Sequence, residues 1–336
     1  RSRQRIHDAL FNLGYLHAEV TTHEEYRKHK VRVRYDVRPG EKYYVDTISV
    51  EVRDTSILGE MEKLAEGTRL KKGMAFDANV LNEERSRITN HMTENGYYYF
   101  NRDFIRYEVD TLRGSTLVRL KMIVSEHIDP TDNSHSPHQK YRIGEVKYSY
   151  DRSTGSPIWF RTSVLHRSNS LVSGEVYSDS KLTDTYSRFN KLGAVAATNV
   201  QMEPNEQDST LLDANIVITP ARLNSIQLGL DGTNTAGDFG AALNFTYQNR
   251  NVFHGSEVFS LKLRTAFEAI RGLEGYADQN YFEYGIDAGM QFPDFIFPFL
   301  SRDFRRKSKA STEFNLTYAS QDRPEFHRRV LTGAWK

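Results

Sequence analysis

Residues 77–97 read DANVLNEERSRITNHMTENGY and have the pattern of one amphipathic helix with start and stop signals. Asp77 is a suitable N-cap, and Phe76 before it can pack on Leu81 as a hydrophobic staple. The apolar residues on one face of this helix are Leu81, Ile88 and Met92. Gly96 follows the last periodic residue, where glycine ends helices because it adopts the left-handed conformation without a Cβ clash. The stretch therefore predicts a helix that packs on a core along one face.

The same signals recur along the chain, which indicates a repeated unit. The helix ends are Leu13-Gly14-Tyr15, Asn95-Gly96-Tyr97 and Leu192-Gly193-Ala194. Ser178 is the counterpart of the Asp77 cap. Two extended stretches follow each glycine, and the later one alternates apolar and polar residues, as in a sheet packed on one face and wet on the other. Its apolar positions are Val31, Val33, Tyr35 and Val37, then Val118, Leu120, Met122 and Val124, then Leu212, Ala214, Ile216 and Ile218.

Each new unit opens with a further strand, at residues 42–50 and 140–146. The predicted order within a unit is therefore strand, helix, helix, strand, strand. A linker at 129–139, rich in Ser, Pro, His and Asn, separates the last two units. The expected units are a partial one at 1–40 and complete ones at 41–128 and 139–220.

The pattern changes beyond Pro220, where helical periodicity ends and strict alternation begins. The apolar faces of five segments are Ile226, Leu228 and Leu230; Ala241, Leu243, Phe245 and Tyr247; Phe259, Leu261 and Leu263; Tyr284, Ile286, Ala288, Met290 and Phe292; and Phe314, Leu316 and Tyr318. Segments of about 10 residues with one apolar face are typical of transmembrane barrel strands. A soluble β-sandwich gives a similar alternation and stays an alternative. Aromatic residues at segment ends, and a tight turn at 251–256 followed by a long loop at 270–280, favour the barrel.

Composition narrows the possible functions. Lys+Arg 45 against Asp+Glu 44 gives a net charge of +1, so no nucleic-acid partner is indicated. Zero cysteines exclude disulfides and thiolate chemistry, and no stretch approaches the roughly 18 apolar residues of a spanning helix. His135 and His138 could be called a metal pair, but they lie in the linker without carboxylates at ligand spacing. No nucleotide-binding or hydrolase motif is present. We therefore expect no enzyme, no metal and no cofactor.

The repeated unit resembles the POTRA domain, a βααββ module. Residues 240–257, which include FTYQNRNVFHGSE, resemble the second barrel strand and following turn of the Omp85 superfamily of outer-membrane proteins. Residues 1–15 and the strand exit Val37-Arg38-Pro39-Gly40 carry a narrower resemblance, to the translocation-and-assembly-module lipoproteins of Bacteroidota, relatives of the BAM-type barrel proteins. The resemblance covers essentially the whole chain. It implies α+β POTRA repeats in the periplasm, followed within 221–336 by the first strands of an antiparallel transmembrane β-barrel in the bacterial outer membrane.

The sequence departs from the family pattern in several respects. The resemblance implies about sixteen barrel strands, within the even range of bacterial barrels, so we expect an incomplete barrel here. The chain begins without a signal peptide and is expected to be a fragment of a longer precursor, and the acylated cysteine of the lipoproteins would precede residue 1. Arg271-Gly272-Leu273 lacks the aromatic residue of the family's barrel-loop motif and comes too early, so no role is carried over to it.

The resemblance implies an assembly and insertion factor that receives unfolded outer-membrane proteins by β-augmentation, in which a client strand pairs with an exposed sheet edge. The strand after each glycine, at 16–24, 97–108 and 194–203, is expected to be such an edge. The residues chosen as the client-binding edge are Phe100, Arg102, Asp103, Ile105, Arg106 and Tyr107. An alternative is that the charges there only protect an edge from aggregation.

Further partners follow from the resemblance. The first barrel strand, with Ile226, Leu228 and Leu230, would form a seam where client strands enter, although these residues could simply face lipid. The basic residues chosen as a contact with anionic headgroups are Arg302, Arg305, Arg306, Lys307 and Lys309, and a solvated turn is the alternative. Partners compatible with the family are the lipid bilayer and an inner-membrane-anchored partner or accessory lipoproteins. Two other functions stay open, a two-partner-secretion transporter for one dedicated substrate and a soluble periplasmic or surface β-rich binding protein.

Overall fold

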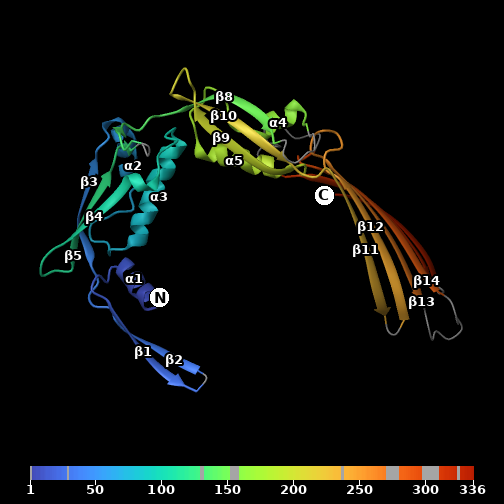
Figure 1. The fold of residues 1–336 in the computed structure, drawn as a ribbon, viewed down its shortest axis with the longest axis horizontal. Helices are drawn as coiled ribbons and strands as arrows, with labels where there is room; N and C mark the ends of the chain where they lie inside the picture. The colour runs from blue at the N-terminus through green and yellow to red at the C-terminus, as the bar shows by residue number, and fades with distance from the viewer. Residues whose placement is uncertain are drawn as a thin grey trace. The chain divides into compact units, whose positions relative to one another are not determined.

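The computed structural model describes residues 2–28, 30–128, 132–151, 159–235, 238–269, 280–296, 310–323 and 326–336. They divide into two compact units, Arg1–Arg142 with Glu175–Ser180 and Ile143–Gly174 with Lys181–Lys336 (Figure 1). Among the described residues, no helix combines the length and the apolar character needed to cross a membrane.

The chain opens with α1 (Ser2–Asn12) and an antiparallel hairpin of β1 (Glu19–Arg27) and β2 (Lys30–Arg38) (Figure 1). Gly14 follows α1 with φ +94°, as predicted for a helix stop. The alternating apolar residues of β2 are between 36 and 52% exposed, and they are Val31, Val33, Tyr35 and Val37. The prediction of a packed face is therefore wrong for this hairpin. α1 buries none of its residues, so it does not cover β2 as a complete module would.

The second module has the predicted βααββ order. Its elements are β3 (Tyr44–Val52), a 3-10 turn (Thr55–Ile57), α2 (Leu58–Ala65), α3 (Ala78–Glu94), a second 3-10 turn (Arg102–Phe104), β4 (Ile105–Thr111) and β5 (Leu117–Val124). The sheet order is β3-β5-β4, with β3 parallel and β4 antiparallel to β5. β5 is thus the central strand, and β4 is an edge.

Local signals explain α3. The carboxylate of Asp77 accepts a hydrogen bond from the backbone N–H of Asn79 at 2.8 Å, and Gly96 ends the helix with φ +103°. The predicted face is buried, since Leu81, Ile88 and Met92 are 6, 1 and 0% exposed. They pack in one core with Val118, Leu120, Met122 and Val124 of β5. The sequence interpretation of this helix is confirmed.

The third module repeats the order with β8 (Arg142–Tyr150), α4 (Thr162–Ser168), α5 (Asp179–Asn190), β9 (Val195–Pro204) and β10 (Leu211–Pro220). Its sheet order is β8-β10-β9, so β9 is an edge as predicted for the strand after the glycine. Gly193, however, is not among the glycines with positive φ. Its role is close approach, because a Cβ there would lie 2.6 Å from Cγ2 of Val258.

The linker between these modules contains a small hairpin of β6 (His127–Ile128) and β7 (His135–Ser136), which the sequence did not indicate. The elements up to β2 lie within 1–40, those from β3 to β5 within 41–128, those from β8 to β10 within 139–220, and all later strands within 221–336. The domain limits themselves stay predictions.

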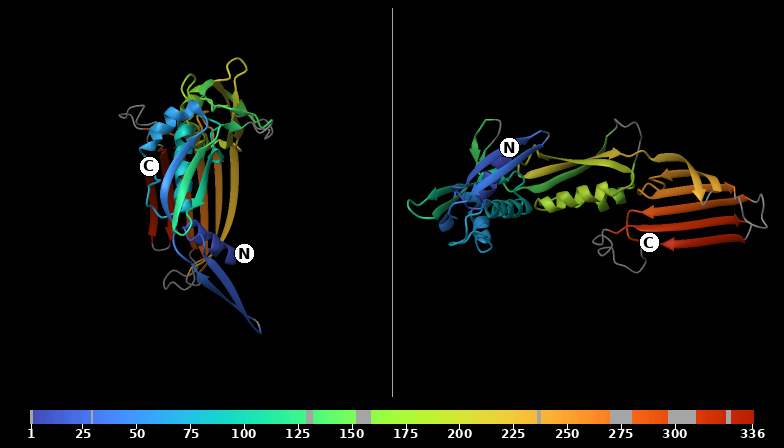
Figure 2. Two further views of the ribbon diagram at one scale, coloured as in Figure 1. Left: turned by 90° about the vertical axis from the view of Figure 1, so that its left-hand side faces the viewer. Right: turned by 90° about the horizontal axis from the view of Figure 1, so that it is seen from below.

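The last region is one six-stranded antiparallel sheet whose strands follow chain order (Figure 2, right). The strands are β11 (Asn224–Thr235), β12 (Asp238–Asn249), β13 (Val258–Ala269), β14 (Asn280–Phe292), β15 (Thr312–Arg323) and β16 (Phe326–Trp335). The predicted count of five strands is wrong, because β16 was missed. His327, Arg328 and Arg329 near its start hide the alternation that marks the other strands.

The strand register places the apolar residues on one face of this sheet. One row of cross-strand neighbours runs through all six strands, and it comprises Leu228, Phe245, Leu263, Ile286, Tyr318 and Leu331. A row on the opposite face comprises Gln227, Thr246, Lys262, Asp287, Thr317 and Thr332. The apolar face is not covered, since Leu228 and Leu331 are 71 and 69% exposed. The fold class predicted from the sequence, POTRA-type modules followed by antiparallel barrel-type strands, is confirmed.

Candidate functional site

The edge strand β4 offers unpaired backbone groups on its outer side. Phe104 accepts a hydrogen bond from the N–H of Ser125 at 2.8 Å, and Leu112 donates one to Leu117 at 3.1 Å, so both bond toward β5. In an antiparallel pair, residues bonded to the partner alternate with residues whose backbone groups point away. The N–H and C=O groups of Tyr107, Val109 and Thr111 therefore point to the open side of the sheet. Such groups can pair with an added strand of any sequence.

The predicted edge residues are placed in three different ways. Phe100 is 3% exposed and packs on Phe104, with ring centroids 5.7 Å apart. Its assignment to the edge strand is wrong, because Asn101 accepts a hydrogen bond from the N–H of Asp103 and starts a 3-10 turn that delays the strand. Arg102 and Asp103 lie in that turn.

The remaining residues do lie on β4, where Ile105 is fully buried and Arg106 is exposed. Tyr107 is half-buried, with its side chain on the α3 side of the sheet. The role of these residues in client binding stays a prediction.

Side chains of β4 and α3 include buried polar atoms without hydrogen-bond partners. The guanidinium of Arg85 lies over the ring of Tyr107, 5.2 Å from its centroid. Within the described residues, the buried hydroxyl of Tyr107, Nε of Arg85 and the hydroxyl of Thr89 lack a hydrogen-bond partner. Burial raises the pKa of Tyr107, and Glu84 adds to the effect.

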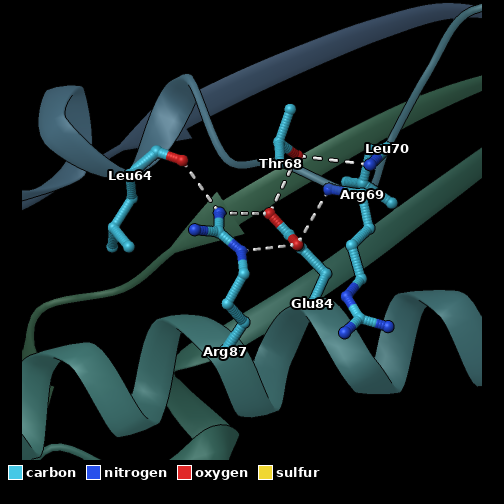
Figure 3. Close-up of polar contacts among 6 residues, drawn as sticks. All are labelled: Leu64, Thr68, Arg69, Leu70, Glu84 and Arg87. Atoms are coloured by element: carbon cyan, nitrogen blue, oxygen red, sulfur yellow. Dashed lines mark hydrogen bonds and ion pairs between the residues drawn. The ribbon is translucent and has the colours of Figure 1, made fainter.

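An ion pair with a buried carboxylate holds α3 in place. Glu84 is 1% exposed and accepts hydrogen bonds from Thr68, from the N–H of Arg69 and from Arg87 (Figure 3). Arg87 also donates to the carbonyl of Leu64 at 2.9 Å, which ties the end of α2 to α3. Although burial acts against it, these hydrogen bonds hold the pKa of Glu84 below its usual value. The carboxylate therefore stays ionised and fixes the helix.

The edge strand β9 of the third module differs from β4. The hydroxyl of Tyr186, on α5, accepts a hydrogen bond from the N–H of Val200 at 3.0 Å and donates one to its carbonyl at 3.3 Å. Both backbone groups of Val200 are therefore occupied by a side chain of the same module. An added strand would have to displace Tyr186 to pair there.

The remaining site residues predicted from the sequence are those of the barrel seam and of the membrane-surface contact. Ile226, Leu228 and Leu230 lie on β11, an edge of the six-stranded sheet, and are 64, 71 and 84% exposed. Their role as a seam stays a prediction. The basic residues Arg302, Arg305, Arg306, Lys307 and Lys309 lie outside the described residues.

The two linker histidines, His135 and His138, lie in different surroundings. His138 is buried, and its backbone N–H donates to Asp54 at 2.6 Å while Nε2 lies 3.0 Å from the carbonyl of Ser125. His135 is exposed in β7. In the part of the chain that the structure describes, no group of three or more His, Asp or Glu residues could hold a metal ion.

The fold and its open edge define a class of protein, a chain of POTRA-type modules joined to an antiparallel sheet with one apolar face. No protein-family model matches the sequence, and no curated protein matches it. Among solved structures, POTRA domains 3–5 of Haemophilus influenzae BamA are similar at 16% identity with TM-score 0.43, over 64% of this chain and 78% of that one. BamA from Haemophilus ducreyi lacking POTRA domains 1–3 is similar at 13% identity with TM-score 0.47, over 87% of this chain and 58% of that one.

CdiB from Acinetobacter baumannii is similar at 12% identity with TM-score 0.38, over 99% of this chain and 63% of that one. Identities this low describe a likeness of fold alone. The narrower resemblance of the sequence to the Bacteroidota lipoproteins stays a prediction. The chain spans about three fifths of the length of the two longer structures.

Proposed function

We propose that this chain belongs to an outer-membrane protein assembly factor, in which the second module receives unfolded clients by β-augmentation at β4. The observation that carries the proposal is the row of outward backbone groups at Tyr107, Val109 and Thr111 on the edge strand β4. Backbone pairing is independent of sequence, so one edge can serve many clients. The charges of Arg106, Glu108 and Asp110 lie on the other face, where they protect the edge from aggregation without blocking it.

The six-stranded sheet supports the membrane part of the proposal. Its apolar face crosses all strands and is uncovered, which suits contact with lipid, while the polar face suits a wet lumen. The modules would then lie in the periplasm, and the sheet would receive the client after its release from β4. The bilayer and unfolded outer-membrane proteins are the proposed partners.

The test is photocrosslinking in cells with the whole protein. A photoreactive residue is placed at Glu108 on β4 or at Gln201 on β9, two exposed positions on the wet faces of the two edge strands. We expect crosslinks to several newly made outer-membrane proteins from Glu108 and few from Gln201, because Tyr186 occupies the β9 edge.

Other outcomes separate the alternatives. Crosslinks from Glu108 to a single exported protein would favour a transporter with one dedicated substrate. Crosslinks only to soluble proteins, together with recovery of the chain outside the membrane fraction, would favour a periplasmic or surface binding protein. Silence at Glu108 would contradict β-augmentation at β4.

A further inference from the structure

The turn between β12 and β13, residues 250–257, is more buried and more strained than a simple hairpin turn. Asn251, Gly255, Ser256 and Glu257 are buried, and His254 and Ser256 adopt positive φ values of 60° and 63°. A non-glycine residue in this conformation is strained by about 1–3 kcal/mol and persists only where the surroundings fix it. Two such residues in one turn therefore indicate strong external contacts.

The turn is first held by its own side chains. Glu257 accepts hydrogen bonds from the N–H groups of Gly255 at 2.9 Å and Phe253 at 3.3 Å. Asn251 accepts one from the N–H of Ser256 at 2.9 Å. These bonds shape the loop but leave one carboxylate oxygen of Glu257 for a partner outside it.

That partner is Arg161, at the start of α4 in the third module. Nη2 of Arg161 donates to Oε1 of Glu257 at 2.6 Å, and the side chain of Glu257 is only 5% exposed. The backbone N–H of Arg161 also donates to the carbonyl of His254 at 2.9 Å. Because a charge-assisted hydrogen bond to a buried carboxylate is strong, this pair is well suited to fix the module against the turn.

Two further contacts surround the ion pair. The rings of Trp159 and His254 stack, with centroids 3.8 Å apart and 19° between their planes. The hydroxyl of Ser256 accepts a hydrogen bond from the N–H of Ala194 at 2.9 Å. Both residues with positive φ therefore contact the third module through their side chains, as do Glu257 through Arg161 and Asn251, whose side-chain amide donates to the carbonyl of Trp159 at 3.3 Å.

Hydrogen bonds in the same region also hold the segment of chain that leads into β11. The N–H of Ala221, just after β10, donates to the carbonyl of Ala194 at 2.9 Å. Arg250 donates from its backbone to Leu223 at 2.9 Å and from its guanidinium to Arg222 at 2.8 Å. The chain that leads from the third module into β11 is thus bound on both sides, by Ala194 of the module and by Arg250 of the turn.

We propose that residues 250–257 are a docking element that holds the third module on the end of the six-stranded sheet, with Arg161 and Glu257 as positioning residues, and that this docking fixes the position of β11. The inference rests on the proposed function only where it gives β11 a role toward clients. The docking itself is a property of the fold and can be measured without any client.

The experiment measures the distance between module and sheet in the whole chain reconstituted in lipid nanodiscs. The sequence has no cysteine, so Glu206→Cys and Lys262→Cys, at exposed positions in the third module and on β13, give one unique pair of spin labels. Electron–electron double resonance then reports the docked and undocked populations. Glu257→Gln is the key variant, because its amide oxygen can still accept the bonds from Gly255 and Phe253 while the ion pair is lost.

We expect Glu257→Gln and Arg161→Gln each to raise the undocked-to-docked ratio about tenfold, as for the loss of a hydrogen bond to a charged group. The double variant should be no worse than either single one, because both remove the same interaction. Glu145→Gln is the control, since it removes a carboxylate of the third module that pairs with Lys147 on the surface at 3.1 Å.

A second variant, Trp159→Ala, removes the stacked ring without touching the sheet and should also loosen the docking. An unchanged distance distribution in Glu257→Gln and Arg161→Gln, with narrow peaks in all samples, would overturn the proposal. Crosslinking from Glu108 is independent of this result, so failure of the docking element and failure of the proposed function are distinguishable.

Discussion

The second and third modules share one fold but differ at their edge strands. The helix signals align Phe76 with Tyr177 and Leu81 with Leu182, which makes Arg85 of α3 the counterpart of Tyr186 of α5. Tyr186 bonds both backbone groups of Val200 and closes the β9 edge. Arg85 instead lies over the ring of Tyr107, and β4 is an edge whose outward backbone groups face away from β5. The residue at one equivalent helix position thus differs between the modules, and only in the third module does it bond the backbone of the edge strand in the described residues.

The largest expected effect is destabilisation of α3, the helix next to the edge strand β4. Glu84→Ala leaves Arg87 half-buried without its carboxylate and should destabilise the second module by about 3 kcal/mol. Hydrogen–deuterium exchange should show faster exchange in α3 and β4 and no change in β9. The control is Glu83→Ala, because Glu83 is exposed and pairs with Arg69 on the surface. Equal protection of α3 in both variants would contradict the role of Glu84.

The second prediction tests which backbone groups are free. Val109→Pro removes an outward N–H of β4 and spares the hydrogen bonds to β5, so client crosslinking from Glu108 should fall about tenfold for one lost bond and a steric block. Asp110→Pro removes an N–H that bonds β5 and should instead destabilise the module. If Val109→Pro keeps full crosslinking and Asp110→Pro keeps full stability, the assignment of outward residues is wrong. Val109→Ala is the control for the side chain.

The third prediction concerns a variant in which the backbone groups of Val200 on β9 become available to an added strand. Tyr186→Phe removes the hydroxyl that occupies Val200 and leaves the ring in place, so the cost in stability should stay near 1 kcal/mol. Crosslinks from Gln201 should then rise about threefold, the effect expected from one to two weak hydrogen bonds. Tyr150→Phe, a change of the same kind on β8, should leave them unchanged. No gain at Gln201 would mean that Tyr186 is not what excludes clients from β9.

The smallest effect concerns alkaline pH at the open edge. Burial raises the pKa of Tyr107 in the folded state, so folding favours the neutral hydroxyl. The stability that this preference contributes to the fold is fully present below pH 10. As pH rises above 10, Tyr107 ionises first in the unfolded state. This ionisation lowers the free energy of the unfolded state and therefore reduces the stability of the fold. Tyr107→Phe should therefore flatten the fall in stability of the second module above pH 10. An unchanged pH profile, measured by chemical denaturation, would contradict the burial of this hydroxyl.

Much of the fold was predictable because its signals are local. The cap at Asp77, the stop at Gly96 and the buried face of α3 follow from neighbouring residues, and the structure confirms them. Alternation predicted five of the six last strands, and β16 escaped because polar residues cover its start. The edge strand was placed in the right element, but its start was set eight residues too early, at Tyr97, because an Asn-capped turn precedes β4.

The sequence by itself determined the repeated modules and the two faces of the last sheet, because helix and strand periodicities decide which side chains face inward. The edge position of β4 and β9 was expected only from the resemblance to POTRA domains. Only the tertiary structure decided which backbone groups of β4 are free, since that depends on the register with β5. It also decided that Tyr186 closes β9 and that Arg161 meets Glu257, 96 residues further along the chain. Contacts of this kind carry no local pattern, because the partners are brought together only when the strands and helices have packed.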